Sequence, residues 1–128
     1  MESLEIAATD RTPAVTFDFD QHHLKIKGES YPEDVSTFYH PIFQALDAYL
    51  ADLDDGSCRF DFELLYFNSS SAKAIMMLME KLDEASGNGA SIEIYWYYDE
   101  EDDTMQELGE EFGEDLEHAG FHLEKMAT

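Results

Sequence analysis

The chain has 128 residues, the usual length of one domain, and it is strongly acidic, with 30 Asp and Glu against 7 Lys and Arg and a formal net charge of −23. We therefore expect a single domain over residues 1–128. Its 44% hydrophobic and 13% aromatic content argues against a disordered acidic chain. The negative charge disfavours binding to nucleic acids and to anionic membranes, since both are themselves negatively charged.

The sequence also constrains where the protein works. Cys58 is the only cysteine, which excludes an intramolecular disulfide. Residues 1–10 lack the basic start and apolar run of a signal peptide, and no apolar stretch approaches the roughly 20 residues that cross a bilayer. We expect a cytoplasmic protein without membrane insertion.

The first half of the chain predicts two strands and a helix. Apolar and polar residues alternate over 14–18 and over 24–27, which predicts an N-terminal hairpin. The segment Tyr31-Pro32-Glu33-Asp34 then breaks the strand. Helical spacing follows, carried by Phe38, Ile42, Leu46, Tyr49, Leu50 and Leu53. Pro41 lies inside this pattern and removes a backbone donor, so the regular helix is expected to begin close to it, with the boundary left open.

The second half predicts alternating strands and helices. Residues 58–67 form a strand, expected to be central, with Tyr66 on the face of Phe60, Phe62 and Leu64, and Phe67 on the opposite face. A helix follows from the polar run 68–71 to the Gly-rich turn 86–89. Residues 92–98 form the next strand, with Tyr95 and Tyr97 on its second face. A third helix runs from the acidic run 99–103 through Ala119, and residues 121–123 form a short last strand.

These elements define an α/β fold class in the order β-β-α-β-α-β-α-β. The strand, helix and strand between residues 58 and 98 imply a right-handed crossover between parallel strands. A mixed β-sheet covered by about three helices follows.

The strand-to-helix junction at residues 68–71 has two interpretations. In the plain one, a serine accepts a hydrogen bond from a free amide of the helix start and does nothing else. In the functional one, a phosphate on Ser69 or Ser70 lies in the field of the helix N-terminus, which stabilises negative charge, and Lys73 pairs with it one turn along.

Resemblances to two groups of known proteins strengthen the functional interpretation. The stretch from Phe60 to Leu78 resembles the strand-to-helix phosphoserine segment of STAS domains, the anti-sigma-factor-antagonist fold. Three segments of the chain resemble the hallmark segments of the SiaC family of bacterial regulatory phosphoproteins. They are Tyr31-Pro32-Glu33, Leu65-Tyr66-Phe67-Asn68-Ser69-Ser70 and Trp96-Tyr97-Tyr98-Asp99-Glu100-Glu101.

The resemblance implies a specific switch. Ser69, the residue after the motif's Asn68, is the expected phosphorylation site, with Ser70 and Ser71 as alternative acceptors and with Asn68, Ser70 and Lys73 around the phosphate. The expected partners are a cognate serine/threonine kinase, a PP2C-type phosphatase and a diguanylate cyclase or other output protein. The unphosphorylated form is expected to activate the cyclase, which links the protein to cyclic di-GMP and biofilm control.

No catalytic, cofactor or metal site is expected. The acidic run at 99–103 lacks the alternating ligands and central Gly of a calcium loop, and neither the histidines nor Cys58 forms a catalytic or metal motif. Two other function classes stay open: an acidic nucleic-acid mimic that inhibits a basic protein, and a metal-dependent hydrolase. A homodimer through the N-terminal hairpin also stays open.

Overall fold

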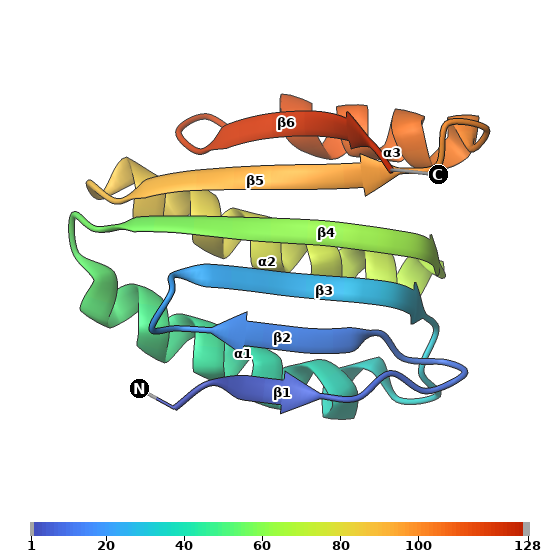
Figure 1. The fold of residues 1–128 in the computed structure, drawn as a ribbon, viewed down its shortest axis with the longest axis horizontal. Helices are drawn as coiled ribbons and strands as arrows, with labels where there is room; N and C mark the ends of the chain where they lie inside the picture. The colour runs from blue at the N-terminus through green and yellow to red at the C-terminus, as the bar shows by residue number, and fades with distance from the viewer. Residues whose placement is uncertain (1, 127–128) are drawn as a thin grey trace.

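The structure, a computed structural model, describes residues 2–126 as one six-stranded sheet with three helices. The strands stand in chain order across the sheet, and Figure 1 shows all three helices behind it. The strands are β1 (Leu4–Ile6), β2 (Ala14–Asp18), β3 (His23–Ser30), β4 (Ser57–Phe67), β5 (Ser91–Tyr98) and β6 (Gly120–Lys125), and the helices are α1 (Val35–Leu53), α2 (Ser69–Gly87) and α3 (Asp103–Glu114).

The connections explain why only one face of the sheet is covered. Strands β1 to β3 are antiparallel neighbours, whereas β3 to β6 are parallel and joined by one helix each. Because such crossovers are right-handed and the strand order always advances in one direction, each helix falls on the same face. The predicted mixed sheet with three helices is confirmed. The short strand β1 is an addition that the sequence analysis missed.

The core lies between the sheet and the helices. Every second residue of β3 and of β5 points into it, as the alternation in the sequence predicted. Phe60 and Phe62 stack with ring centroids 4.5 Å apart, and the Phe62 ring lies 5.7 Å from the ring of Trp96. The Trp96 indole Nε1 donates to the Met105 carbonyl at 3.0 Å, which fixes α3 on the sheet.

A β-bulge changes the end of β4. Gly28 pairs with Leu64 and Glu29 pairs with Tyr66, so Leu65 is one residue more than β3 can match. The extra residue interrupts the alternation, leaving Leu65 and Tyr66 exposed and returning Phe67 to the core. The expected facing of Tyr66 and Phe67 is therefore wrong. Strand β4 is central as predicted, although helices cover only one of its faces.

The start of α1 also differs from the expectation. The helix begins at Val35, six residues before Pro41, because the Asp34 carboxylate accepts a hydrogen bond from the Thr37 amide at 3.1 Å. This bond to the backbone lowers the pKa of Asp34. Pro41 lies inside the helix with an exposed side chain, so the boundary that the sequence left open lies at Val35 and not near Pro41.

Helix α3 ends at Glu114 and does not reach Ala119. The carboxylate of Asp83 on α2 accepts the amides of Glu117, His118 and Ala119, the last two at 2.8 and 2.9 Å. Amides bonded to another helix cannot continue the i to i−4 pattern of α3. The apolar residues up to Ala119 therefore belong to two parts, the helix as far as Glu114 and a loop that is hydrogen-bonded to Asp83.

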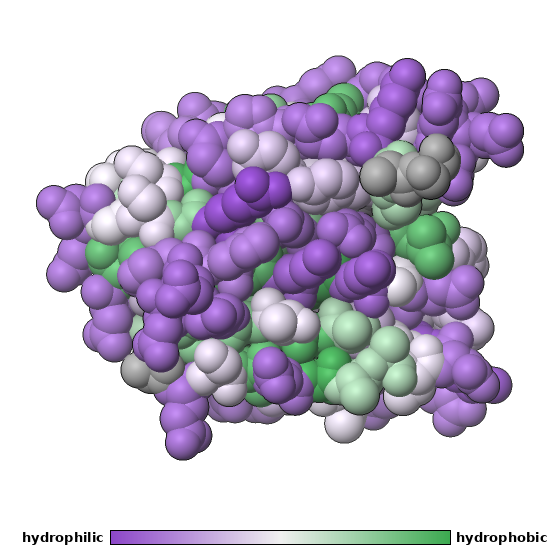
Figure 2. Space-filling view, viewed as in Figure 1, coloured by the Kyte–Doolittle hydropathy of each residue, from purple (hydrophilic) through white to green (hydrophobic). Residues whose placement is uncertain are grey.

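The second face of the sheet is open to solvent and mostly hydrophilic (Figure 2). Within residues 2–126, none of the helices combines the length and the hydropathy that crossing a membrane requires.

Candidate functional site

The candidate site lies at one edge of the sheet, where the parallel strands β3, β4 and β5 end. The three segments singled out in the sequence, 31–33, 65–70 and 96–101, each lie where one of these strands passes into the helix that follows it. The Asn68 amide donates to the Ser30 carbonyl at 3.2 Å, which joins the end of β3 to the start of α2. The carboxyl ends of parallel strands are where α/β proteins most often place their binding sites.

Asn68 caps helix α2. Its side-chain Oδ1 accepts the Ser71 amide at 2.9 Å, and its carbonyl accepts the Ala72 amide at 2.9 Å. The plain interpretation, in which one of the serines caps this helix, is therefore wrong. The capping function belongs to Asn68, and the hydroxyls of Ser69 and Ser70 are not used for it.

Ser71 is completely buried and belongs to the core. Its Oγ accepts a hydrogen bond from the Ser30 hydroxyl at 2.9 Å, and the Ser30 oxygen lies 2.7 Å from the Tyr39 hydroxyl. Burial raises the pKa of Tyr39, so this phenol stays protonated. The chain of three hydroxyls ties α2 to β3 and to α1 inside the core.

Ser69 and Ser70, in contrast, are exposed in the first turn of α2. Ser70 lines a groove of about 580 Å³ between α1 and α2, and Lys73 lines the same groove. Lys73 takes part in none of the ion pairs found within residues 2–126. The groove also holds Glu33 and Asp34, so a negative group there meets both one cation and two carboxylates.

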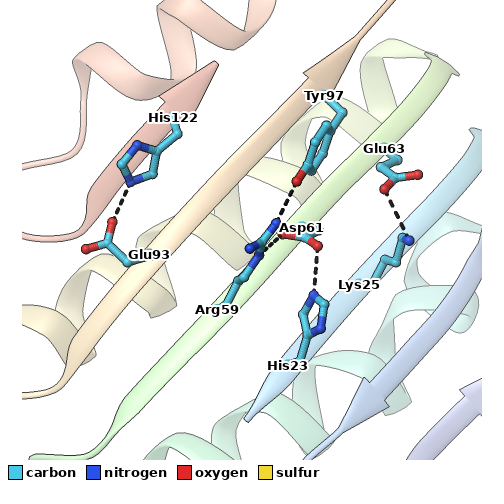
Figure 3. A network of polar contacts seen from close by, with 8 residues as sticks. All are labelled: His23, Lys25, Arg59, Asp61, Glu63, Glu93, Tyr97 and His122. Atoms are coloured by element: carbon cyan, nitrogen blue, oxygen red, sulfur yellow. Dashed lines mark hydrogen bonds and ion pairs between the residues drawn. The ribbon is translucent and has the colours of Figure 1, made fainter. Parts of the chain in front are cut away.

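The open face of the sheet carries a second cluster of polar residues (Figure 3). Asp61 lies at its centre, 2.9 Å from the Arg59 guanidinium and 2.7 Å from the His23 imidazole. Arg59 also donates to the Tyr97 hydroxyl at 2.6 Å and lies over the ring of Tyr95, and its hydrogen bond with Asp61 raises its pKa. The polar side chains of His23, Asp61, Arg59 and Tyr97 are therefore all hydrogen-bonded within this cluster.

This network does not form a nucleophilic site. His23 and Asp61 resemble the base and orienting acid of a hydrolase, but no Ser, Thr or Cys hydroxyl or thiol within residues 2–126 is hydrogen-bonded to His23. The lone Cys58 is buried, and burial raises the pKa of its thiol to about 11, which keeps it protonated near neutral pH.

The acidic run at 99–103 has structural roles. Asp102 caps α3 by accepting the Met105 amide at 3.0 Å, and Asp99 accepts the Glu101 amide at 2.9 Å. Across the part of the chain that the structure describes, no three His, Cys, Asp or Glu side chains are grouped so that they could hold a metal ion.

The sequence analysis missed the residues that hold the site in place. Tyr39 directly follows Phe38 but is not part of the predicted apolar stripe of α1, and Ser30 stands at a strand end without a motif. A buried Ser or Tyr needs a hydrogen-bond partner, and that partner comes from elsewhere in the chain. For Asp61, the alternating pattern gives the face but not the neighbours His23 and Tyr97.

Comparisons with known proteins agree with this geometry. Residues 6–126 match the family described as SiaC family regulatory phosphoprotein. An uncharacterized protein of Pseudomonas aeruginosa, strain UCBPP-PA14, is 36% identical over 115 residues, which are 90% of each chain. The crystal structure of apo-SiaC from Pseudomonas aeruginosa has a TM-score of 0.90 and 34% identity, covering 97% of this chain and 99% of that one.

A further solved structure contains a partner. A chain in the crystal structure of the diguanylate cyclase SiaD in complex with its activator SiaC, again from Pseudomonas aeruginosa, matches with a TM-score of 0.90 and 33% identity, covering 96% of this chain and 99% of that one. Family match, sequence identity and fold agree over nearly the whole length. The chain belongs to the SiaC family of regulatory phosphoproteins.

Proposed function

We propose that this chain is a phosphorylation-controlled partner-switching protein. Its unphosphorylated form binds and activates a diguanylate cyclase, and a phosphate on Ser69 prevents that binding. The output is the cellular level of cyclic di-GMP and, through it, biofilm formation. A dedicated serine/threonine kinase adds the phosphate and a PP2C-type phosphatase removes it, both in the cytoplasm.

The relatives support the kind of partner. SiaC from Pseudomonas aeruginosa is the activator of the diguanylate cyclase SiaD and forms a complex with it. This chain has the same fold over almost its entire length, at 33% identity. The groove beside Ser70 is partly apolar, because Met77, which is 38% exposed, lines it together with Phe43, and a partly apolar surface suits docking.

One observation carries the proposal: Asn68 caps α2, so the exposed hydroxyl of Ser69 has no structural task at the helix start. The first amides of a helix have no partner within it, and the helix dipole favours negative charge there. A phosphate on Ser69 would be stabilised by these amides and by Lys73. It would also add bulk and about two negative charges to a surface that a partner must contact.

The three candidate phosphate acceptors differ in how accessible they are to a kinase. Ser69 and Ser70 are both open to a kinase, whereas a kinase reaches Ser71 only after the start of α2 has opened. Ser69 is preferred because it follows Asn68, as the phosphorylated residue does in the family motif.

The test is a reconstitution with the protein from its own cells. We would separate its phosphorylated and unphosphorylated forms, map the phosphate by peptide mass spectrometry, and measure cyclic di-GMP production by a diguanylate cyclase of the same organism with each form. The unphosphorylated form should bind and activate the cyclase. The phosphorylated form should do so only after treatment with a PP2C-type phosphatase.

Two variants assign the residue. Ser69→Ala should activate the cyclase constitutively, whereas Ser70→Ala, the matched neighbour, should stay under phosphate control. If the Ser70 variant escapes control and the Ser69 variant does not, Ser70 is the acceptor. If neither form of the wild-type chain affects any diguanylate cyclase of the organism, the proposed output is wrong.

A further inference from the structure

The β-bulge at the end of β4 places two large apolar side chains on the surface. Of the large hydrophobic residues within 2–126, Leu65 and Tyr66 are the most exposed, at 54% and 51%. Regular alternation would have buried Tyr66 beside Leu64. The bulge instead turns it to solvent three residues before Ser69, and bulges of this kind often redirect a side chain next to a functional site.

Tyr66 is held in place rather than loosely exposed. Its ring packs edge-to-face against the ring of Tyr31, with centroids 5.7 Å apart. The Tyr31 amide donates to the Arg11 carbonyl at 2.7 Å, so the loop after β3 is fixed to the chain before β2. Leu65 and Tyr31 also border a hollow of about 610 Å³. Aromatic side chains fixed before binding lose little conformational entropy when a partner covers them.

The rim of this apolar patch is acidic. Asp10 and Glu29 line the hollow, and Glu29 is the residue that pairs with Tyr66 across the two strands. The nearby cation Arg11 is already bound to Glu33, with 2.7 Å between its guanidinium and the carboxylate. The acidic run at 99–103 begins at the same edge of the sheet.

We infer that Tyr31, Leu65 and Tyr66 form the apolar anchor of a protein-docking surface, whose occupant presents an apolar pocket bordered by Lys and Arg. The acidic rim selects this chemistry, because opposite charges around an apolar centre favour association and like charges oppose it. A second copy of this chain would bring the same acidic rim and a net charge of −23. An anionic lipid surface is repelled for the same reason.

This inference rests on the proposed function for the identity of the partner: the occupant is the diguanylate cyclase. The patch and the switch adjoin, since Tyr66 and Ser69 flank the junction that the Asn68 amide fixes to Ser30. A protein seated on Tyr66 would therefore cover Ser69, and a phosphate there would lie inside the contact area.

The experiment measures the affinity of the unphosphorylated chain for the cyclase of its own organism that the wild-type chain activates. Tyr66→Ala should weaken binding at least tenfold, since a central buried Tyr is a typical hot spot. Met76→Ala is the control, because it also truncates an exposed apolar side chain but on α2, and it should change the affinity less than twofold. Thermal unfolding checks that both variants are folded.

A second pair of variants tests the rim, with the same change of total charge in both. Glu29→Lys should weaken binding and flatten its salt dependence, whereas Glu107→Lys, an exposed change of the same size on α3, should do neither. If Tyr66→Ala binds within twofold of wild type while phosphate still releases the cyclase, the anchor is refuted and the proposed switch stands.

A separate experiment covers the case in which the proposed function fails and the docking surface remains to be tested. If the wild-type chain binds no cyclase, a photo-crosslinking residue at position 66 identifies the protein that covers the patch in cells. The anchor then stands only if that protein, once purified, binds the wild-type chain in a salt-sensitive way and loses at least tenfold affinity for Tyr66→Ala. If no such protein is found, the anchor is refuted as well.

Discussion

The two faces of the sheet bury side chains by different physical means, and neighbouring residues on β4 show it. Phe62 points to the helices and is completely buried among apolar rings, whereas Asp61 points to the open face and is 3% exposed. The Asp61 carboxylate is bonded to His23 and Arg59, whose side chains are themselves 47% and 43% exposed. Low exposure therefore does not identify the core by itself.

The difference matters because the two kinds of contact stabilise a protein unequally. Apolar surface removed from water contributes roughly 25 cal/mol per Å², so one large core side chain is worth several kcal/mol. Exposed ion pairs contribute about 0–1 kcal/mol, because water competes for both partners. The helix-covered face should hold the fold together, and the open face should tolerate change.

The largest effect is expected from truncating equivalent aromatic residues on the two faces. Phe62→Ala should lower the free energy of unfolding by about 3–5 kcal/mol, whereas Tyr97→Ala, on the open face of the adjacent strand, should cost about 1 kcal/mol. Urea unfolding followed by circular dichroism measures both. Equal losses would mean that the open face belongs to the same cooperative core.

The next effect concerns the polar chain inside the covered face. Ser71→Ala removes the acceptor of the Ser30 hydroxyl, and a buried donor left without a partner costs about 1–3 kcal/mol. Ser69→Ala, two residues earlier and exposed, should change the free energy of unfolding by less than about 0.5 kcal/mol. A Ser69 variant as unstable as the Ser71 variant would mean that both hydroxyls are structural.

A smaller loss is expected where α2 holds the loop before β6. Asp83→Ala should cost about 1–2 kcal/mol at pH 7, since three amides lose a charged acceptor at a partly exposed site. Burial by itself would raise the pKa of Asp83, but the hydrogen bonds from these amides hold it below its usual value of 3.8.

The sign of this shift fixes the pH dependence. A carboxyl group with a lowered pKa in the folded state stabilises the protein fully above pH 3.8, and loses that contribution as the pH falls through the lower folded value. The stabilities of wild type and Asp83→Ala should therefore converge in acid. A constant difference from pH 7 to pH 2 would contradict a role for the carboxylate charge.

The smallest effect is expected from Asp61→Asn on the open face. The amide keeps the shape and part of the hydrogen bonding, and the exposed cations regain water, so the cost should be below about 1 kcal/mol. Thermal unfolding at low and high salt should show the deficit shrinking as salt screens the lost charge. A cost of several kcal/mol would show that the network behaves as a buried ion pair.

The candidate site was predictable in part. The Asn68-Ser69 junction follows directly from local signals, an apolar strand, a polar run and a helical pattern. The burial of Ser71 does not, because its hydrogen-bond partner Ser30 is 41 residues away in the chain, and Ser30 is bonded in turn to Tyr39 on α1. The spacing of apolar residues likewise could not show whether α1 begins after Asp34 or near Pro41. The hydrogen bond from the Thr37 amide to the Asp34 carboxylate fixes the start of the helix.

The sequence by itself determined the order of the elements from β2 onward, the inward positions of β2, β3 and β5, and the resemblance that names the family, because these depend on the period of apolar residues and on local motifs. Only the tertiary structure decided that Tyr66 is exposed, that Asn68 rather than a serine caps α2, and that α3 stops at Glu114. Each of these depends on a partner far away in sequence: the shorter strand β3 beside the bulge, the strand end that positions Asn68, and the Asp83 carboxylate that binds the amides after α3.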